Sequence, residues 1–366
     1  MVRVKLIMVL FNKHPSEMLI FRFPLMEQGK NHDKINSIKM ARVFKIRSVG
    51  IFLLALWLQE SFAQEATKEN GIHLADPTIF VHEDRYYLYG TVEGNADQGF
   101  LVYSSTDKKE WKGPVGAKEG FALKRDDVFG DKGFWAPQVF YHNQKFYMAY
   151  TANENIAIAE SQSPLGPFTQ AVKKSLDAPV KQIDPFIYKD EDGKIYLYHV
   201  RLREGNRIYV AEMTEDLAAI KEETLRECVA ASDEWENTAQ APWPVAEGPT
   251  VMKKNGLYYL IYSANDFRNP DYAVGYAVSD HPLGPWKKFG GNPILHQKDL
   301  NWPGTGHGDL FSDETGGLSY VFHTHFSNGS VAPRRTALIK AGFSTTGGSL
   351  PKLQMDKTTF ELLQQP

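Results

Sequence analysis

The sequence predicts an all-β protein that folds as a five-bladed β-propeller. Five segments of the 366-residue chain share one strand–turn–strand pattern, and they recur at nearly regular spacing. No long stretch of helical periodicity lies between these segments; such periodicity would be expected if helices alternated with the strands. Five similar β-units arranged around a channel are typical of a propeller.

Each repeat begins with a short apolar strand, passes through a tight turn and ends with a second strand rich in aromatic residues. The repeats start at residues 76, 136, 184, 247 and 308, so their spacings are 60, 48, 63 and 61 residues. About fifty to sixty residues are enough for four short strands. The expected turn pairs are Glu83-Asp84, His142-Asn143, Asp192-Gly193, Asn255-Gly256 and Gly316-Gly317, which are residue types typical of hairpin turns.

A second repeated motif indicates the outer part of the blades. The sequence Pro-Leu-Gly-Pro occurs at residues 164–167 and again at 282–285, each time after an apolar strand pattern. Proline cannot donate a ladder hydrogen bond, so these segments are expected in outer turns or at sheet edges. A pair of β-sandwiches would also use short strands and frequent turns, but the period near sixty residues favours the propeller.

Composition excludes several classes of function. The chain has 41 Lys and Arg against 44 Asp and Glu, a net charge of −3, so no basic excess indicates binding to nucleic acid or an anionic membrane. Its single cysteine, Cys228, excludes an intramolecular disulfide framework and a cysteine-rich zinc or iron–sulfur site. Aromatic residues make up 13% of the chain, which fits either an aromatic-rich β-protein or a sugar-stacking cleft.

The amino-terminal part of the chain is predicted to direct export. Residues 40–63 combine a basic start, the apolar run 50–58 and small residues before position 64, the three parts of a signal peptide. The run is shorter than the roughly 20 residues needed to span a bilayer, so we expect no stable membrane span. Residues 1–39 are an upstream segment that we expect not to be translated, with translation starting at Met40. Residues 64–366 would then be the propeller domain of a secreted or periplasmic protein.

Acidic residues open three of the five repeats: Asp76, Asp184 and Glu247. The first strands of a propeller line its axis, so these carboxyl groups are expected to converge at one end of the channel. Two carboxyl groups on opposite sides of a sugar ring are what glycoside hydrolysis requires, and a third negative charge would raise the pKa of the acid. A single Asp-Pro pair, in contrast, is more often a structural turn.

The motifs that contain these acids resemble those of glycoside hydrolase family 43. They are LADPTIF with Asp76, FWAPQVF at 134–140, QIDPFIY with Asp184, AEGPTV with Glu247 and GTGHGDLF at 304–311. The resemblance covers roughly residues 72–340 and implies an inverting enzyme that acts on arabinose- or xylose-containing plant polysaccharides. By this resemblance Asp76 is the general base, Glu247 the general acid, and Asp184 the residue that raises the pKa of the acid and orients it.

The same resemblance suggests further site residues. Phe134 and Trp135 would form part of the sugar platform, although either could instead belong to a blade core, and Arg334 would reach the hydroxyl groups of the sugar. His307 would lie near a structural calcium or water site in the channel, or be a hydrogen-bonded core histidine. His323 and His325 alternate on one strand and are its candidate partners. Trp235 and Trp243 precede Glu247 and would either wall the leaving-group side or pack the loop. No cofactor is required for the reaction.

The sequence therefore predicts an exported monomeric glycosidase, with α-L-arabinofuranosidase as the first choice of activity. The chain runs only about 26 residues beyond the last clear strand near Lys340, whereas many β-xylosidases of the family carry an additional carboxy-terminal sandwich. β-Xylosidase and endo-arabinanase are alternatives within the family. A non-catalytic sugar-binding propeller is an alternative of a different class, but it would be expected to have lost one of the three acids.

Overall fold

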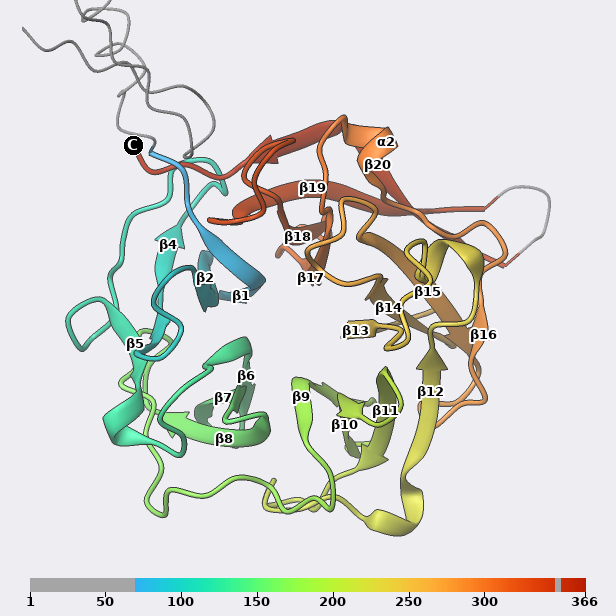
Figure 1. The fold of residues 1–366 in the computed structure, drawn as a ribbon. Helices are drawn as coiled ribbons and strands as arrows, with labels where there is room; N and C mark the ends of the chain where they lie inside the picture. The colour runs from blue at the N-terminus through green and yellow to red at the C-terminus, as the bar shows by residue number, and fades with distance from the viewer. Residues whose placement is uncertain (1–69, 346–349) are drawn as a thin grey trace, which may run out of the picture. The chain divides into compact units, whose positions relative to one another are not determined.

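Residues 70–345 and 350–366 are described by a computed structural model. In this part of the chain five β-sheet blades surround a central channel, which confirms the predicted five-bladed β-propeller (Figure 1). The predicted upstream segment 1–39 and signal peptide 40–63 lie outside the described residues. Over the ranges described, no helix is both long and apolar enough to cross a membrane.

The blades follow one another along the chain. The first blade contains β1 (Leu74–His82), β2 (Arg85–Val92) and β4 (Tyr103–Ser105), with the pair β3 (Gly99–Leu101) and β5 (Phe121–Lys124) beside it; the second contains β6 (Trp135–His142), β7 (Lys145–Ala152) and β8 (Asn155–Ser161). The third contains β9 (Gln182–Lys189), β10 (Ile195–Leu202), β11 (Asn206–Glu212) and β12 (Arg226–Ala230). The fourth contains β13 (Ala246–Lys254), β14 (Leu257–Ala264), β15 (Ala273–Ser279) and β16 (Lys287–Lys288), and the fifth β17 (Gly306–Ser312), β18 (Leu318–Thr324), β19 (Arg335–Ser344) and β20 (Lys352–Leu362). A short helix, α2 (Gln297–Leu300), links the last two blades.

The five predicted hairpins are the first two strands of the five blades, but one turn is shifted. Positive φ angles at Glu83 and Asp84 and at Asn255 and Gly256 confirm two of the expected turn pairs. In the second blade, His142 pairs with Lys145. The turn there is therefore Asn143-Gln144, one residue later than the predicted His142-Asn143.

The number of strands differs from the predicted four in two of the five blades. The third, fourth and fifth blades have four strands, whereas the first two have three in the described structure. In the second blade only the isolated bridge between Glu160 and Thr169 occupies the outer position. The sequence analysis also missed β20, which forms the outer edge of its blade and lies beyond the last repeat that the analysis recognised.

The predicted outer turns hold neighbouring blades together. The buried Tyr89 hydroxyl of the first blade donates to the Pro164 carbonyl of the second at 2.5 Å. The equivalent Tyr198 hydroxyl of the third blade donates to the Pro282 carbonyl of the fourth at 2.6 Å. Each Pro-Leu-Gly-Pro segment therefore gives a carbonyl acceptor to a tyrosine of the blade before it, so both phenolic groups are buried with a partner.

The two ends of the described domain close the ring. Thr336 in β19 donates its hydroxyl to the Leu74 carbonyl at 2.9 Å and accepts from the Leu74 amide at 3.0 Å. Ile72 donates its amide to the Leu363 carbonyl at 2.9 Å. Leu74, Ile72 and Leu363 also belong to one buried apolar cluster with Phe311 and residues of the fifth blade. Blade one and blade five are therefore joined by backbone pairing and by a shared core.

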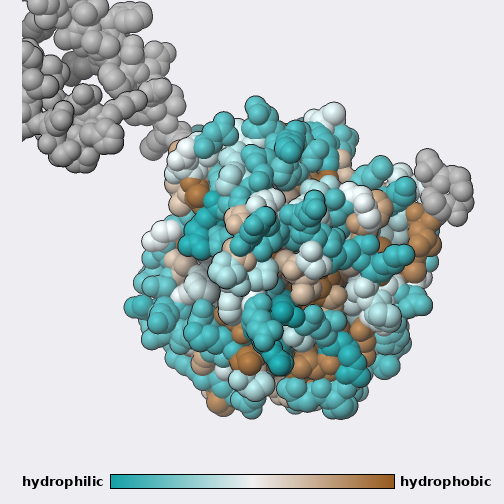
Figure 2. All heavy atoms as spheres, turned by 45° about the vertical axis from the view of Figure 1, so that its right-hand side comes forward, coloured by the Kyte–Doolittle hydropathy of each residue, from teal (hydrophilic) through white to brown (hydrophobic). Residues whose placement is uncertain are grey.

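The outer surface is mostly hydrophilic. In the view of Figure 2, apolar residues form only small separated areas on the face that it shows. Among the described residues, the large hydrophobic side chains that are exposed are Val115, Tyr141, Val172, Trp243 and Leu350. Of these, Trp243 directly precedes the strand that contains Glu247.

Candidate active site

A bulge at the same position of every first strand aims side chains into the channel. In the first blade the pairing of β1 with β2 is interrupted between Ala75 and Thr78, and the residue after Ala75 has a positive φ. The same conformation occurs at Asp76 (48°), Ala136 (46°), Asp184 (55°), Gly248 (60°) and His307 (42°). For a residue other than glycine it costs about 1–3 kcal/mol, and bulges of this kind re-aim side chains near functional sites.

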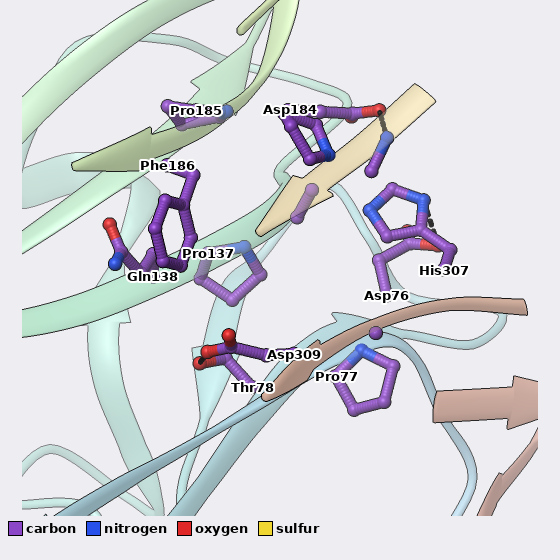
Figure 3. A pocket seen from close by; sticks show the side chains of 14 residues that line it. Asp76, Pro77, Thr78, Pro137, Gln138, Asp184, Pro185, Phe186, His307 and Asp309 are labelled. Carbon is purple, nitrogen blue, oxygen red and sulfur yellow. Dashed lines mark hydrogen bonds and ion pairs between the residues drawn. The ribbon is translucent and has the colours of Figure 1, made fainter. Parts of the chain in front are cut away.

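Three of these bulge residues bring titratable groups together. Asp76, Asp184 and His307 lie around the same end of a narrow channel pocket of about 30 Å³ (Figure 3). The sequence analysis placed Glu247 in register with the two aspartates, and this was wrong. Glu247 pairs with Ser263 just as Ala75 pairs with Thr91, so Gly248 occupies the bulge position of the fourth blade and Glu247 precedes it.

Glycine at position 248 is required by two features. Its φ of 60° is in the left-handed region, and a Cβ atom there would lie 2.8 Å from Cδ2 of His307. The His307 ring is therefore packed directly against the backbone that follows Glu247. A side chain at position 248 would displace the histidine from the site.

The bulges are held by hydrogen bonds from the preceding blade. The amides of Ala136, Asp184 and His307 donate to hydroxyl groups on the second strand of the blade before; the acceptors are Thr91 (3.0 Å), Thr151 (3.0 Å) and Ser263 (2.7 Å). The amide of Asp76 donates in the same way to Nδ1 of His323 at 3.1 Å. In the third blade the equivalent residue is Val200, which pairs with Ile183 and has no acceptor in its side chain. The Gly248 amide donates instead to Oδ2 of Asp184 at 3.2 Å.

Asp76 is surrounded by groups that favour its ionised form. Oδ1 lies 3.3 Å from Nδ1 of His307 and 3.2 Å from Nη1 of Arg334. Oδ2 accepts a hydrogen bond from the Thr91 hydroxyl at 2.6 Å. Burial opposes ionisation, but the charges of His307 and Arg334 hold the pKa of Asp76 well below its usual value. The group is therefore a carboxylate at neutral pH.

Arg334 is fixed against this carboxylate. Its Nε donates to Oε1 of Glu93 at 2.7 Å, and its guanidinium group lies 4.6 Å from the centre of the Phe267 ring. Arg334 lies just before β19, whereas the neighbouring Arg335 packs over Trp302 and Phe326. The structure thus supports the choice of Arg334 over Arg335 as the arginine of the site, and its contact with the sugar stays a prediction.

Glu247 has the opposite protonation preference. Its residue is only 9% exposed. Burial and the nearby Asp184 raise the pKa of Glu247 to about 7, against the opposing effects of His307, Tyr272 and Asn206. The Tyr272 hydroxyl donates to Oε1 at 2.9 Å, and the Asn206 amide donates to Oε2 at 2.8 Å. One carboxyl group of the site is therefore ionised at neutral pH, while the other is still about half protonated there.

The remaining two groups balance these charges. Burial raises the pKa of Asp184. The positive charge of His307 lowers this pKa, whereas the negative charge of Asp76 raises it. Burial lowers the pKa of His307, but the surrounding Asp76, Asp184 and Glu247 outweigh this effect and raise it above its usual value. His307 is thus the cation at the centre of three acidic side chains, and it reduces the repulsion among them.

Asp76, Asp184, Glu247 and His307 form what we call the catalytic layer. Below it, a second set of side chains lies in the channel. The Asp309 carboxyl group accepts hydrogen bonds from the hydroxyls of Thr78 (2.6 Å) and Thr250 (2.7 Å). Burial raises the pKa of Asp309 to about 6. These contacts tie together the first strands of blades one, four and five directly beneath the catalytic layer.

The described residues do not fit a protein-held metal ion in the channel. No group of three or more His, Cys, Asp or Glu side chains is placed to hold a metal in this part of the chain. Nδ1 of His307 faces the Asp76 carboxylate, and Nε2 of His325 lies 2.8 Å from the Phe267 carbonyl. A calcium ion, which takes six to eight oxygen ligands, would depend mainly on water here, and no step of the reaction is derived through it.

One predicted contact residue belongs to the core. Phe134 is fully buried and stacks on Tyr150 with a centroid distance of 5.8 Å, so the prediction that it forms the sugar platform is wrong. The strand alternation explains this, because neighbouring residues point to opposite sides. Trp135 begins β6 and is half-buried, and its role in binding sugar stays a prediction.

Several residues of the site were missed by the sequence analysis, or were given another role. Thr91, Tyr272 and Asn206 contact Asp76 or Glu247 but lie outside the acid motifs. His323, a candidate metal partner of His307, instead accepts the Asp76 amide and stacks on Tyr272 at 5.7 Å. A signal existed for Thr91, since Thr151 and Ser263 occupy the same place in their own repeats. None existed for Asn206 and Tyr272, which come from strand ends outside the repeated pattern.

A propeller that gathers one ionised and one protonated carboxyl group in a buried site belongs to the class of glycoside hydrolases, which require this pair. Comparison with known proteins defines the family. The model of the glycosyl hydrolases family 43 matches residues 71–346, and the chain belongs to this family. It is accordingly an inverting O-glycosidase.

Individual relatives show what the chain is similar to. The β-D-galactofuranosidase xynD of Aspergillus niger is 25% identical, and the match covers 76% of this chain and 82% of the relative. The xylosidase/arabinosidase 43A of Humicola insolens is 28% identical over 69% of this chain and 88% of the relative. Among solved structures, an endo-1,4-β-xylanase of Bacteroides thetaiotaomicron matches with a TM-score of 0.73 and 41% identity, covering 81% of this chain and 98% of that chain.

The packing of His307 on Gly248 yields a first prediction. Gly248→Ala should lower kcat/KM at least tenfold, because moving a catalytic neighbour by about 1 Å can cost about 10²-fold. Gly256→Ala is the matched control: its φ is also positive, at 79°, but nothing lies within 4 Å of the added Cβ. Steady-state kinetics of both variants tests this, and equal activities would show that the His307 contact is unimportant.

The pKa of Glu247 yields a second prediction. The protonated form is the active acid, so kcat/KM should fall as pH rises through about 7, the value to which burial and Asp184 raise its pKa. The carboxylate of Asp76 should remain ionised down to low pH, which leaves the acid side of the profile broad. Asp184→Asn removes a charge that favours the protonated form of Glu247, so the alkaline limb should move to lower pH and the rate should fall. A limb that stays in place would contradict this role of Asp184.

Proposed function

We propose that the protein is an exported, inverting glycosidase that removes single sugar units from arabinose- or xylose-containing plant glycans, with α-L-arabinofuranosidase as its main activity. The observation that carries this proposal is the pair of buried carboxyl groups with opposite protonation, Asp76 and Glu247. Pairs of titratable groups whose environments separate their pKa values are what acid–base catalysis uses.

In the proposed reaction, Asp76 is the general base and Glu247 the general acid. The Asp76 carboxylate takes a proton from water as the water oxygen attacks the anomeric carbon. Glu247 gives its proton to the glycosidic oxygen as the bond between that oxygen and the anomeric carbon breaks. The sugar product has the opposite anomeric configuration, and both carboxyl groups return to their starting states by proton exchange with water.

Asp184 acts through Glu247 in this mechanism. Its carboxyl group accepts the amide of Gly248, the residue directly after Glu247, so it both orients this backbone and raises the pKa of the acid. His307 and Arg334 keep Asp76 ionised and fix its position. Arg334 is also the side chain that we propose to reach a hydroxyl group of the bound sugar.

The enclosed site supports removal of one terminal unit. The side chains of Asp76 and Arg334 are only 10% and 12% exposed, so a sugar unit that reaches them has to be largely enclosed by the protein. The relatives named as a galactofuranosidase and a xylosidase/arabinosidase support a pentose or furanose unit. The solved relative named as an endo-xylanase keeps xylan cleavage as the second candidate.

A panel of aryl glycosides and plant polysaccharides tests this function. The wild-type protein should release arabinose, with weaker or no release of xylose, and Asp76→Ala should lose activity on every substrate. Glu247→Ala should lose about 10²–10⁴-fold on unactivated glycosides, but much less on an aryl glycoside whose leaving group needs no proton.

The leaving-group dependence separates the two roles. If Glu247→Ala turned over an unactivated glycoside at the wild-type rate, Glu247 would not be the acid. Release of xylose without arabinose would establish a xylosidase, and internal cleavage of xylan or arabinan would establish an endo-acting enzyme. Circular dichroism of each variant controls for loss of the fold.

Export is proposed from the signal-peptide pattern of residues 40–63. Expression of the gene with its upstream region in a Gram-negative host should give a protein that begins near Gln64 in the periplasm or the medium. Amino-terminal sequencing and intact mass measure this directly. A cytoplasmic protein that retains Phe21 or Phe23 would contradict both the export and the start at Met40.

A further inference from the structure

A chain of side-chain contacts leads from the protein surface to Glu247. The Trp243 indole Nε1 donates to Oδ1 of Asn206 at 2.9 Å, and Nδ2 of Asn206 donates to Oε2 of Glu247 at 2.8 Å. Trp243 is 48% exposed. Asn206 is half-buried, and Glu247 is buried. The exposed tryptophan is therefore two hydrogen bonds away from the acid.

The chemistry of the groups fixes the direction of this chain. An indole N–H can only donate, so the atom of Asn206 that faces Trp243 has to be the carbonyl oxygen. The amide nitrogen of Asn206 then faces Glu247 and can only donate to it. Without the indole N–H, the Asn206 side-chain amide could rotate by half a turn. Its oxygen would then face the Glu247 carboxylate, and the two negatively polarised groups would repel each other.

The backbone holds the two segments together. Gly205 has a φ of 128°, and a Cβ atom on it would lie 2.5 Å from the Pro244 carbonyl oxygen. The amide of Asn206 donates to this same oxygen at 2.9 Å, and Asn206 forms a parallel bridge with Val245. The turn before β11 is thus docked on the segment that leads from Trp243 to Glu247.

Trp243 also borders a hollow of about 350 Å³. The hollow is lined on one side by the loop from Asn237 to Val245 and on the other by residues 265–269. Asn265 ties these two sides together: it accepts from the Thr238 amide at 2.8 Å and donates to the Trp235 carbonyl at 2.7 Å. Asn265 is only 3% exposed. The two sides of the hollow are therefore connected by the hydrogen bonds of a buried side chain.

The hollow suits a sugar ring. The Trp243 nitrogen is occupied by Asn206, but its exposed ring face is free to pack on the apolar face of a sugar. Asp266, Arg268 and Asn269 on the opposite side present polar groups, and the Arg268 guanidinium group already pairs with Asp266.

Resting on the proposed function, we propose that this hollow receives the leaving-group part of the glycoside and that Trp243 and Asn206 are positioning residues for the Glu247 carboxyl group. As Glu247 gives up its proton, negative charge develops on its oxygens, and the Asn206 N–H already points at Oε2. A donor placed where charge develops lowers the barrier without reorganisation at the moment of reaction. Trp243 holds the amide in that orientation.

The test uses Trp243→Phe and Asn206→Ala in the full-length protein, with pH profiles of kcat and kcat/KM. Either variant removes a contact that favours the charged form of Glu247, so the alkaline limb should move to higher pH, by about one unit for Asn206→Ala. On an unactivated glycoside kcat should fall by roughly one to two orders of magnitude for Asn206→Ala and less for Trp243→Phe. On an activated aryl glycoside both should remain near the wild type.

A double variant and a control separate positioning from packing. If Trp243 acts through Asn206, the double variant should show the limb shift of Asn206→Ala and no more. Trp235→Phe changes another tryptophan of the same loop, whose buried Nε1 has no hydrogen-bond partner among the described residues. It should leave the alkaline limb in place even if it lowers the melting temperature.

The hollow itself is tested by Trp243→Ala. This variant should raise KM for an oligosaccharide several-fold more than Trp243→Phe does, because the ring face is lost, while KM for a small aryl glycoside changes less. Wild-type pH profiles for both Trp243→Phe and Asn206→Ala would overturn the positioning role, and unchanged KM in Trp243→Ala would overturn the binding role. If the wild-type protein cleaved no glycoside at all, the proposed function would fail instead.

Discussion

The site depends on one repeated interaction, the hydrogen bond from a bulged first strand to the second strand of the blade before it. Each bulge has a backbone conformation that an isolated strand would not adopt. In four blades the hydrogen bond from the bulge amide to Thr91, Thr151, Ser263 or His323 holds it there. The same bulge turns the side chain of Asp76, Asp184 or His307 toward the axis. Packing between blades and the arrangement of the catalytic groups therefore have a common origin.

The fourth blade departs from this hydrogen-bond pattern, and the departure affects the general acid, Glu247. Because Val200 offers no acceptor, Asp184 takes the Gly248 amide, and a carboxyl group replaces a neutral hydroxyl at this junction. This brings a negative charge close to Glu247 and raises its pKa. This change in the repeated pattern adds to the effect of burial on Glu247, while His307 and Arg334 act in the opposite direction on Asp76, and the two carboxyl groups thus differ in protonation.

Sequence reasoning succeeded where the repeat itself carried the information. The five hairpins, the outer Pro-Leu-Gly-Pro turns and the convergence of Asp76 and Asp184 all follow from comparing one repeat with the next. It failed where a one-residue offset mattered: Glu247 precedes the bulge, the second turn is Asn143-Gln144, and Phe134 points into the core while Trp135 does not. Asn206 and Tyr272 could not be found, since their contacts with Glu247 depend on loops whose path no local pattern specifies.

The way the ring closes also bears on how the protein is made. Ile72 and Leu74 pack and pair with Thr336 and Leu363, which are synthesised almost three hundred residues later. Until the carboxy-terminal strand is available, the first blade has an open edge and an uncovered apolar flank, and exposed edges and surfaces of this kind promote aggregation. Contacts between such distant parts of a chain also form slowly. The ring can therefore close only after the segment that follows β20 has been synthesised, and until then the first blade lacks its neighbour.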